Sequence, residues 1–332
     1  MGQSWDIFDV DNKVKIEYLG KLGESLFDES CDRLATVITR FLIKESPIVV
    51  HYLRATTGLL KLPLEIIDAI LESVEDFKDA AALVMTNKML YSLGFKAIQR
   101  RLAKIAAPSV GNRIVCHGRG TCGRDLPPGL TEKDWQEAVQ WVTENPGSDY
   151  GADEDLEETC SYPYYADKAF PKLPDWYHRV PNDWRLMSGW EYAPRFDRKI
   201  GGPKWEKALR ELLQVHKPSS ENLVLCNLTK RVYVDGLKAD QYVKHDIIDR
   251  SIPFLFGAIL MCHICWSTAS DVAFWYEGKI HRGVWAGHRF EITTKDRLKD
   301  IKPIEGGVQD DWKDVTKEAM KETNRVAKAY TE

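Results

Sequence analysis

The chain has 332 residues, enough for one large domain or two ordinary domains, each with its own core. With 44% hydrophobic residues, 29% charged residues and eleven tryptophans, its composition excludes a largely disordered protein. The formal net charge is -4 and the basic residues are spread along the sequence, so we expect no broad cationic surface and no binding of DNA.

The N-terminal sequence MGQSWDIFDVDNK is acidic where a secretion signal needs a basic start and an apolar run. The longest apolar stretch, residues 252–264, is too short to cross a bilayer. We therefore expect a cytoplasmic or nuclear protein that is neither secreted nor bound to a membrane. The seven cysteines show no framework spacing, which predicts reduced thiols and no disulfides.

Residues 25–43 place apolar side chains at helical spacing, with Ser25 or Asp28 available as the N-cap. This pattern predicts one amphipathic helix within an N-terminal helical extension, residues 1–58.

A second group of helices is expected in residues 59–108. Pro63 occupies a first-turn position, and Ile66, Ile67 and Ile70 then repeat on one face. Two further helical patterns follow, at residues 80–94 and 95–102. The sequence therefore predicts three short helices joined by turns.

This segment resembles the F-box, because Leu-Pro-x-Glu-Ile-hydrophobic is followed by an acidic break and by a small-residue helix that leads to a Leu-Tyr pair. The resemblance implies docking on the Skp-type adaptor subunit of a cullin ubiquitin ligase, as a helix-in-groove contact. The partner-binding residues would be Leu62, Pro63, Ile66, Ile67 and Ile70. The alternative is an ordinary helical bundle packed on the rest of the protein.

Residues 109–332 form the third predicted region, a mixed α/β domain rich in tryptophan and tyrosine. Strand patterns occur in residues 112–116, 221–228, 229–234 and 282–293, helical patterns in 131–144 and 310–330, and a fully apolar run in 254–267 is either strand or helix. No period of twenty to fifty residues recurs, so the domain is not a repeat array. The predicted fold class is α+β, a helical F-box-like module followed by a non-repeat globular domain.

Three blocks in this region extend the resemblance. LCNLTKRVYV at residues 225–234, CWS at 265–267 and RGVWAGHRFEI at 282–292 are together similar to a large family of fungal F-box-like proteins, mostly uncharacterised. The similarity covers residues 59–318, with His288 where the family pattern has Asp. The candidate pocket residues are Trp266, Ser267, Arg282, Trp285, His288 and Arg289. Indole rings beside small residues also fit tight core packing.

Cys262 and Cys265 have the spacing of half a zinc site, but no second Cys or His pair follows at a suitable distance. We expect no metal and no cofactor. A pair of Cys265 with His281 or His288 would suit nucleophilic catalysis. However, the apolar flanks of Cys265 should raise the pKa of its thiol and leave little thiolate.

Asp310, Asp311 and Asp314 open the C-terminal helical pattern, where carboxylates favour a helix N-terminus. The segment also resembles the Asp-Asp-x-x-Glu motif of fungal arginine-containing cyclodipeptide synthases, with Asp in place of Glu. That resemblance implies that these carboxylates bind a guanidinium and hold an attacking amine.

Two functions follow from the sequence. The first is a substrate-receptor adaptor of a cullin-type ubiquitin ligase, with the Skp-type subunit as partner. The alternative is an enzyme of secondary metabolism, a cyclodipeptide synthase that takes its aminoacyl groups from aminoacyl-tRNA and keeps the F-box-like helices as a structural remnant.

Overall fold

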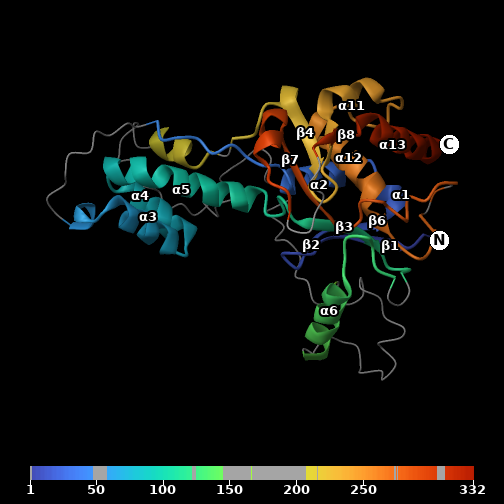
Figure 1. Ribbon diagram of the computed structural model, residues 1–332, viewed down its shortest axis with the longest axis horizontal. Coiled ribbons are helices and arrows are strands. Elements are labelled where there is room, and N and C mark those ends of the chain that lie inside the picture. The colour runs from blue at the N-terminus through green and yellow to red at the C-terminus, as the bar shows by residue number, and fades with distance from the viewer. Residues whose placement is uncertain are drawn as a thin grey trace. The chain divides into compact units, whose positions relative to one another are not determined.

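A computed structural model describes residues 2–47, 58–121, 125–144, 166, 207–214, 216–272, 274, 276–304 and 311–332. The chain forms two compact units (Figure 1). We call them the sheet unit, residues 1–39, 109–174 and 219–332, and the helical unit, residues 40–108 and 175–218. Helices and a mixed sheet together give the predicted α+β class. None of the helices in the described ranges has both the length and the apolar character needed to cross a membrane.

The sheet unit is built on eight described strands in the order β2-β1-β3-β7-β4-β5-β8, with β6 paired to β3. Their bounds are β1 Ser4–Asp9, β2 Val14–Lys21, β3 Arg113–Gly118, β4 Leu223–Asn227, β5 Val232–Asp235, β6 Cys265–Trp266, β7 His288–Thr294 and β8 Lys313–Asp314. Most neighbouring strands are antiparallel, whereas the β3–β6 and β5–β8 pairs are parallel.

The N-terminal residues belong to this sheet, so the predicted helical extension is wrong for residues 4–21. β1 pairs with β2 on one side and with β3 on the other, and Trp5, Ile7 and Phe8 are fully buried. The partner strand β3 lies about a hundred residues further along the chain, so local sequence could not reveal this pairing. As a result, the boundary predicted near residue 58 does not separate the two units.

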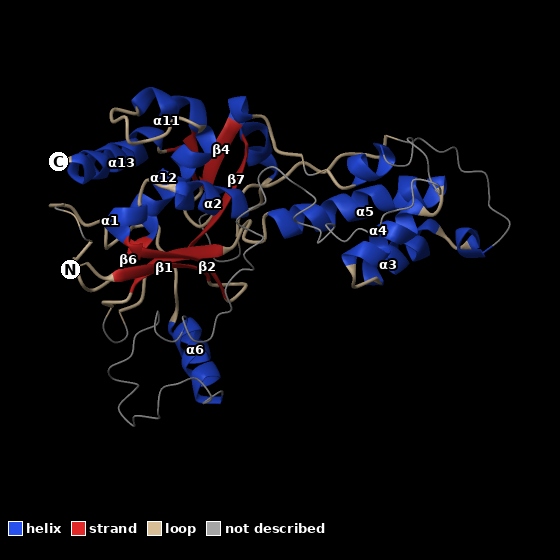
Figure 2. Ribbon diagram, turned by 180° about the vertical axis from the view of Figure 1, so that it is seen from behind, coloured by secondary structure: helices blue, strands red, loops and turns tan. Residues whose placement is uncertain are grey.

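Helices lie on both sides of the sheet at β1 (Figure 2). On one face, α12 (Ile252–Ile264) contacts α2 (Glu29–Val37), α11 (Gly236–Tyr242) and α13 (Thr316–Thr331). On the other, α6 (Glu132–Glu144) packs through Trp135 against Phe8 and Val115. Short elements complete the unit: α1 Leu22–Ser25 and the 3-10 helices η4 Ser220–Asn222 and η5 Lys295–Asp300.

Two of the predicted helices begin with side-chain caps. The side chain of Asp28 accepts a hydrogen bond from the backbone N–H of Ser30, so α2 begins at the second of the two predicted caps. At the start of α6, Asp134 Oδ2 accepts from the Thr131 N–H at 2.8 Å, and Thr131 Oγ1 accepts from the Asp134 N–H at 3.4 Å. This reciprocal pair satisfies backbone donors that a helix N-terminus leaves free.

The apolar run that the sequence left open as strand or helix is the helix α12, followed directly by β6. Every residue of α12 from Phe254 to Ile264 is buried. Gly257 lies so close to α2 that a Cβ atom there would stand 2.0 Å from the carbonyl oxygen of Cys31. The absence of a side chain at Gly257 therefore sets how closely the two helices approach.

The helical unit contains η1 (Gly58–Lys61), α3 (Leu64–Ser73), α4 (Phe77–Met85) and α5 (Lys88–Ala106). Helices form in this segment as predicted, but the helix expected over residues 80–94 is broken at residues 86–87, and residues 95–102 continue α5 without a turn. Asp76 and Asn87 cap α4 and α5 through their side chains. Its core is a cluster of twelve buried residues drawn from α3, α4, α5 and residues 212–213. Gln99 joins α5 to that last segment, because its Nε2 donates to the Leu212 carbonyl at 2.7 Å.

We predict that Gly257→Ala lowers the free energy of unfolding by about 3 kcal/mol, because the new methyl group overlaps backbone atoms that cannot move independently. Urea denaturation measures the change. Gly20→Ala is the control, since Gly20 has φ +64° but nothing within 4 Å of its Cβ position. Only backbone strain of about 1 kcal/mol is expected at Gly20. Equal losses in both variants would contradict the close contact of the two helices.

Candidate functional site

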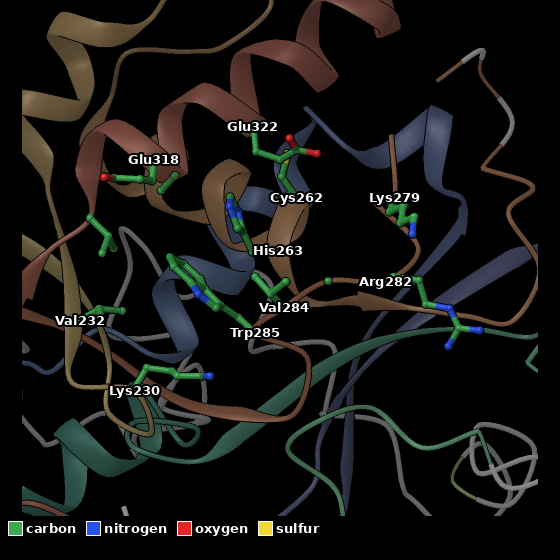
Figure 3. A pocket seen from close by; sticks show the side chains of 13 residues that line it. Lys230, Val232, Cys262, His263, Lys279, Arg282, Val284, Trp285, Glu318 and Glu322 are labelled. Carbon is green, nitrogen blue, oxygen red and sulfur yellow. The ribbon is translucent and has the colours of Figure 1, made fainter. Parts of the chain in front are cut away.

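A cavity of about 560 Å³ opens in the sheet unit (Figure 3). Its walls come from the β4–β5 turn, the C-terminal end of α12, the loop before β7 and one face of α13. The lining residues are Lys230, Val232, Cys262, His263, Lys279, Arg282, Gly283, Val284, Trp285, Val315, Glu318, Ala319 and Glu322. A volume of this size suits a small molecule, and the lining combines apolar surface with both signs of charge.

His263 is the most enclosed polar group of this pocket, with 7% of its surface exposed. Its Nδ1 lies 2.7 Å from the carbonyl oxygen of Ile259, and its ring stacks on the Trp285 indole with centroids 4.5 Å apart. Because a carbonyl only accepts, Nδ1 carries the proton, and in the neutral ring Nε2 is an acceptor. Among the described residues, none hydrogen-bonds to Nε2. Burial lowers the pKa of His263, which keeps the ring neutral near pH 7.

Two carboxylates from α13, Glu318 and Glu322, are further hydrogen-bond acceptors in the pocket lining. Glu322 accepts a hydrogen bond from the Tyr276 hydroxyl and lies 3.7 Å from Arg325. Glu318 is exposed, and no ion pair to it is found in the described part of the chain. The same holds for the ammonium groups of Lys230 and Lys279, which also line the cavity. Unpaired charges of both signs therefore face one cavity.

Sequence reasoning did not single out most of these residues. Cys262 is predicted only as part of half a zinc site, and Lys230 only as part of the block at residues 225–234, whereas no predicted site includes His263, Glu318 or Glu322. One signal was available, since His263 is the one imidazole in an otherwise apolar run at residues 252–264. His263 and the two glutamates line one cavity because α12 packs against α13. About fifty residues separate these helices in the sequence, so no local pattern could reveal this arrangement.

Two of the six candidate pocket residues line the cavity, Arg282 and Trp285. Arg282 also contacts residues that do not line the cavity. Its guanidinium pairs with Asp125 at 2.7 Å and lies 4.7 Å from the centre of the Trp266 ring. The Trp266 indole in turn donates from Nε1 to the Asp125 carbonyl at 3.0 Å. Trp266 thus anchors the loop at Asp125 and does not line the cavity.

Ser267, His288 and Arg289 also lie away from the cavity lining. The Ser267 hydroxyl donates to Gln3 Oε1 at 2.8 Å, which ties the strand end to the N-terminus. Arg289 pairs with Asp11 at 2.5 Å, and Asp11 is shared with Arg113 at 2.8 Å. These interactions give the residues of the family-like blocks structural roles.

His288 is buried at the first position of β7, where its Nδ1 accepts a hydrogen bond from the Asn227 side-chain amide at 3.0 Å. Burial, together with the nearby Lys230 ammonium, lowers the pKa of His288 to about 4. The imidazole is therefore neutral in the folded protein at neutral pH and serves as an acceptor inside the sheet.

Burial raises the pKa of the thiols of both Cys262 and Cys265. The Cys265 Sγ donates to the Met261 carbonyl at 3.1 Å and is paired neither with His281 nor with His288 in the described structure. Within the described ranges, no three His, Cys, Asp or Glu side chains are grouped in a way that could hold a metal ion. Thiols in this setting pack as apolar groups.

Asp311 and Asp314 of the acidic cluster are not among the residues that line the pocket. Asp310 lies outside the described residues, and Asp311 is exposed. Asp314 accepts hydrogen bonds from the Thr316 N–H and hydroxyl at 3.0 and 2.5 Å, and from Lys238 Nζ at 2.6 Å. Burial acts to raise the pKa of Asp314, but these partners outweigh it and hold the pKa below its usual value. Asp314 therefore stabilises the start of α13.

The five predicted partner-binding residues, which lie in α3 or just before it, differ in exposure. Leu62 is 39% exposed and Ile66 is 47% exposed, and Pro63 is exposed as well. Ile70 is half-buried, whereas Ile67 is fully buried in the core of the helical unit. We call Leu62, Pro63, Leu64, Ile66 and Ile70 the α3 surface; Leu64 is 39% exposed and was not among the predicted residues.

Comparison of the chain with family models, with curated proteins and with solved structures finds no match.

The buried His288 predicts a pH dependence of stability. Its folded pKa of about 4 lies below the unfolded value of about 6.5, so its contribution is present above pH 6.5 and is lost as the pH falls toward 4. Between about pH 7.5 and about pH 5, the wild type should lose about 2 kcal/mol more than His288→Asn, which keeps an acceptor but does not titrate. Urea unfolding at both pH values measures this difference, and identical losses would contradict it.

The contacts of Asp314 predict unequal effects within the acidic cluster. Asp314→Asn should lower the free energy of unfolding by about 1 kcal/mol, because the ion pair with Lys238 is lost while Thr316 keeps its acceptor. Asp311→Asn should change it by less than about 0.5 kcal/mol, since Asp311 is exposed. Thermal and urea unfolding distinguish them, and a larger effect at Asp311 would reverse the assignment.

Proposed function

We propose that this protein is an adaptor of the F-box type, in which the helical unit docks on the Skp-type subunit of a cullin ubiquitin ligase and the sheet unit binds the target. The observation that carries the proposal is the α3 surface. It combines exposed apolar side chains with a helix that is already anchored from its other face.

Exposed apolar side chains are concentrated at the start of α3. Of the ten exposed large hydrophobic residues in the described chain, three fall within residues 62–66. Single exposed apolar residues are common on protein surfaces, whereas a cluster favours an interface. Ile67 and Leu71 are buried on the opposite side of the helix, so α3 is held in place while the α3 surface faces solvent. This arrangement suits a helix-in-groove contact.

The docking proposal predicts that the double change Pro63→Ala and Ile66→Ala weakens binding of a purified Skp-type subunit by about a hundredfold, because buried apolar anchors dominate such contacts. Isothermal titration measures the affinity. Both side chains are exposed in the free protein, so the free energy of unfolding should fall by no more than about 1 kcal/mol.

Leu237→Ala is the matched control, since Leu237 is an apolar residue with 51% exposure in the sheet unit. It should leave the affinity unchanged. A wild-type protein that does not bind the Skp-type subunit, or a double variant that binds as well as the wild type, would refute the docking role of the α3 surface.

A second candidate function is favoured by the pocket. It is an enzyme of secondary metabolism, an aminoacyl-tRNA-dependent cyclodipeptide synthase that makes arginine-containing products. The pocket would supply Glu318 and Glu322 as acceptors for a cationic group and His263 Nε2 as a proton acceptor. The contacts of Asp314 argue against a ligand-binding role for that residue.

The synthase hypothesis predicts an arginine-containing cyclodipeptide in cells that express the wild-type protein, detected by mass spectrometry. Its loss in Asp311→Asn at matched expression would support a role for the acidic motif, because the fold should be unchanged. Loss only in Glu318→Gln would instead place the chemistry in the pocket. Absence of the product from the wild type would remove this candidate.

A further inference from the structure

We infer that the pocket between α12, α13 and the β4–β5 turn is a binding site for a small apolar zwitterion of dipeptide size, with its ammonium on the α12–α13 side and its carboxylate at Lys230. This inference is independent of the docking role of the α3 surface, which lies in the other unit.

The ammonium end follows from the acceptors that line one side of the cavity, Glu318, Glu322 and His263. His263 is more than nine-tenths buried, and its Nε2 has no hydrogen-bond donor among the described residues, although its Nδ1 is tied to the backbone. This nitrogen is not among the fully buried polar atoms that lack a partner, so it is open to the cavity, and a ligand that donates there takes the place of water. Glu318 and Glu322 line the same cavity, and an ammonium has three N–H groups to share among such acceptors.

The carboxylate end follows from the position of Lys230. In Figure 3, Glu318, Glu322 and His263 lie on one side of the Trp285 ring and Lys230 lies on the other. No carboxylate in the described ranges pairs with the Lys230 ammonium. A single α-amino acid carries its two charges on neighbouring atoms, whereas a dipeptide separates them by its backbone. The opposed positions of the acceptors and of Lys230 therefore favour the longer molecule.

The apolar body of the ligand follows from the rest of the lining. Val284 is 63% exposed although it sits among the pocket residues, and Val232, Val315 and Ala319 extend the same apolar wall. A side chain that covers Val284 would remove apolar area from water. The cavity of about 560 Å³ has room for a dipeptide with two aliphatic side chains.

The test uses three probes that differ only in their ends: leucyl-leucine, N-acetyl-leucyl-leucine and leucyl-leucine amide. The full-length protein is titrated with each by calorimetry. Leucyl-leucine should bind, and blocking either end should weaken binding about tenfold, because one charged contact is lost in each case. No binding of leucyl-leucine at millimolar concentration, or equal binding of all three probes, would overturn the inference.

Two variants then assign the ends. Glu318→Gln should weaken leucyl-leucine about tenfold but leave the N-acetyl probe unaffected, since that probe has no ammonium to lose. Lys230→Met should weaken leucyl-leucine by a similar factor but leave the amide probe unaffected. Both side chains are exposed, so both variants should fold as the wild type does.

Glu221→Gln and Lys244→Met remove the same charges at exposed positions outside the pocket lining and should bind all probes like the wild type. If these controls weaken leucyl-leucine as much as the pocket variants do, the effect is one of overall charge and the proposed site is wrong. If the pocket variants weaken each probe alike, the assignment of the two ends is wrong.

Discussion

The contact of α12 with α2 is the constraint on which the sheet unit depends. α12 carries almost no polar group, so it must be covered on all sides, and α2, α11, α13 and β3 provide that cover. Gly257 allows the backbone of α2 to approach directly. Because α12 ends at Ile264 and β6 begins at the next residue, its position also determines where His263 lies and where the chain enters the sheet.

Partly buried charged residues of the sheet unit form ion pairs with one another, whereas several charged side chains that line the pocket form none with the described residues. Asp11 holds Arg113 and Arg289, Asp134 also pairs with Arg113, and His288 is kept neutral inside the sheet. Such groups are costly to bury unless each finds a partner. At the pocket, by contrast, the side chains of Glu318 and Lys230 and the Nε2 of His263 make no ion pair or hydrogen bond with the described residues.

The two units therefore offer two different kinds of surface. The α3 surface consists of exposed apolar side chains, and the proposed partner is a protein groove. The pocket of the sheet unit is concave and carries both signs of charge, which suits a small polar molecule with an apolar body. An adaptor whose target-binding unit also senses a small molecule would use both, whereas an enzyme with remnant helices would use only the second.

Local sequence patterns predicted the elements whose signals are short-range. Helical spacing identified α3 and α6, and the buried apolar run marked α12 as core, because these signals depend on neighbours within one or two turns. It did not place the break between α4 and α5. The same patterns placed the β1 and β2 residues in a helical extension, because a strand is stabilised by its partners. For β1 one of those partners, β3, is distant in sequence.

Part of the candidate site could likewise be predicted from local sequence, and part of it could not. The sequence identified Arg282 and Trp285, which lie in one distinctive block, but the block also contains His288 and Arg289, which the fold uses to hold the sheet together. Whether a polar residue meets a ligand or a structural partner is decided by which distant segments surround it. Only the tertiary structure brings Glu318, His263 and Lys230 to one cavity, because they belong to three elements that meet through packing and not through sequence proximity.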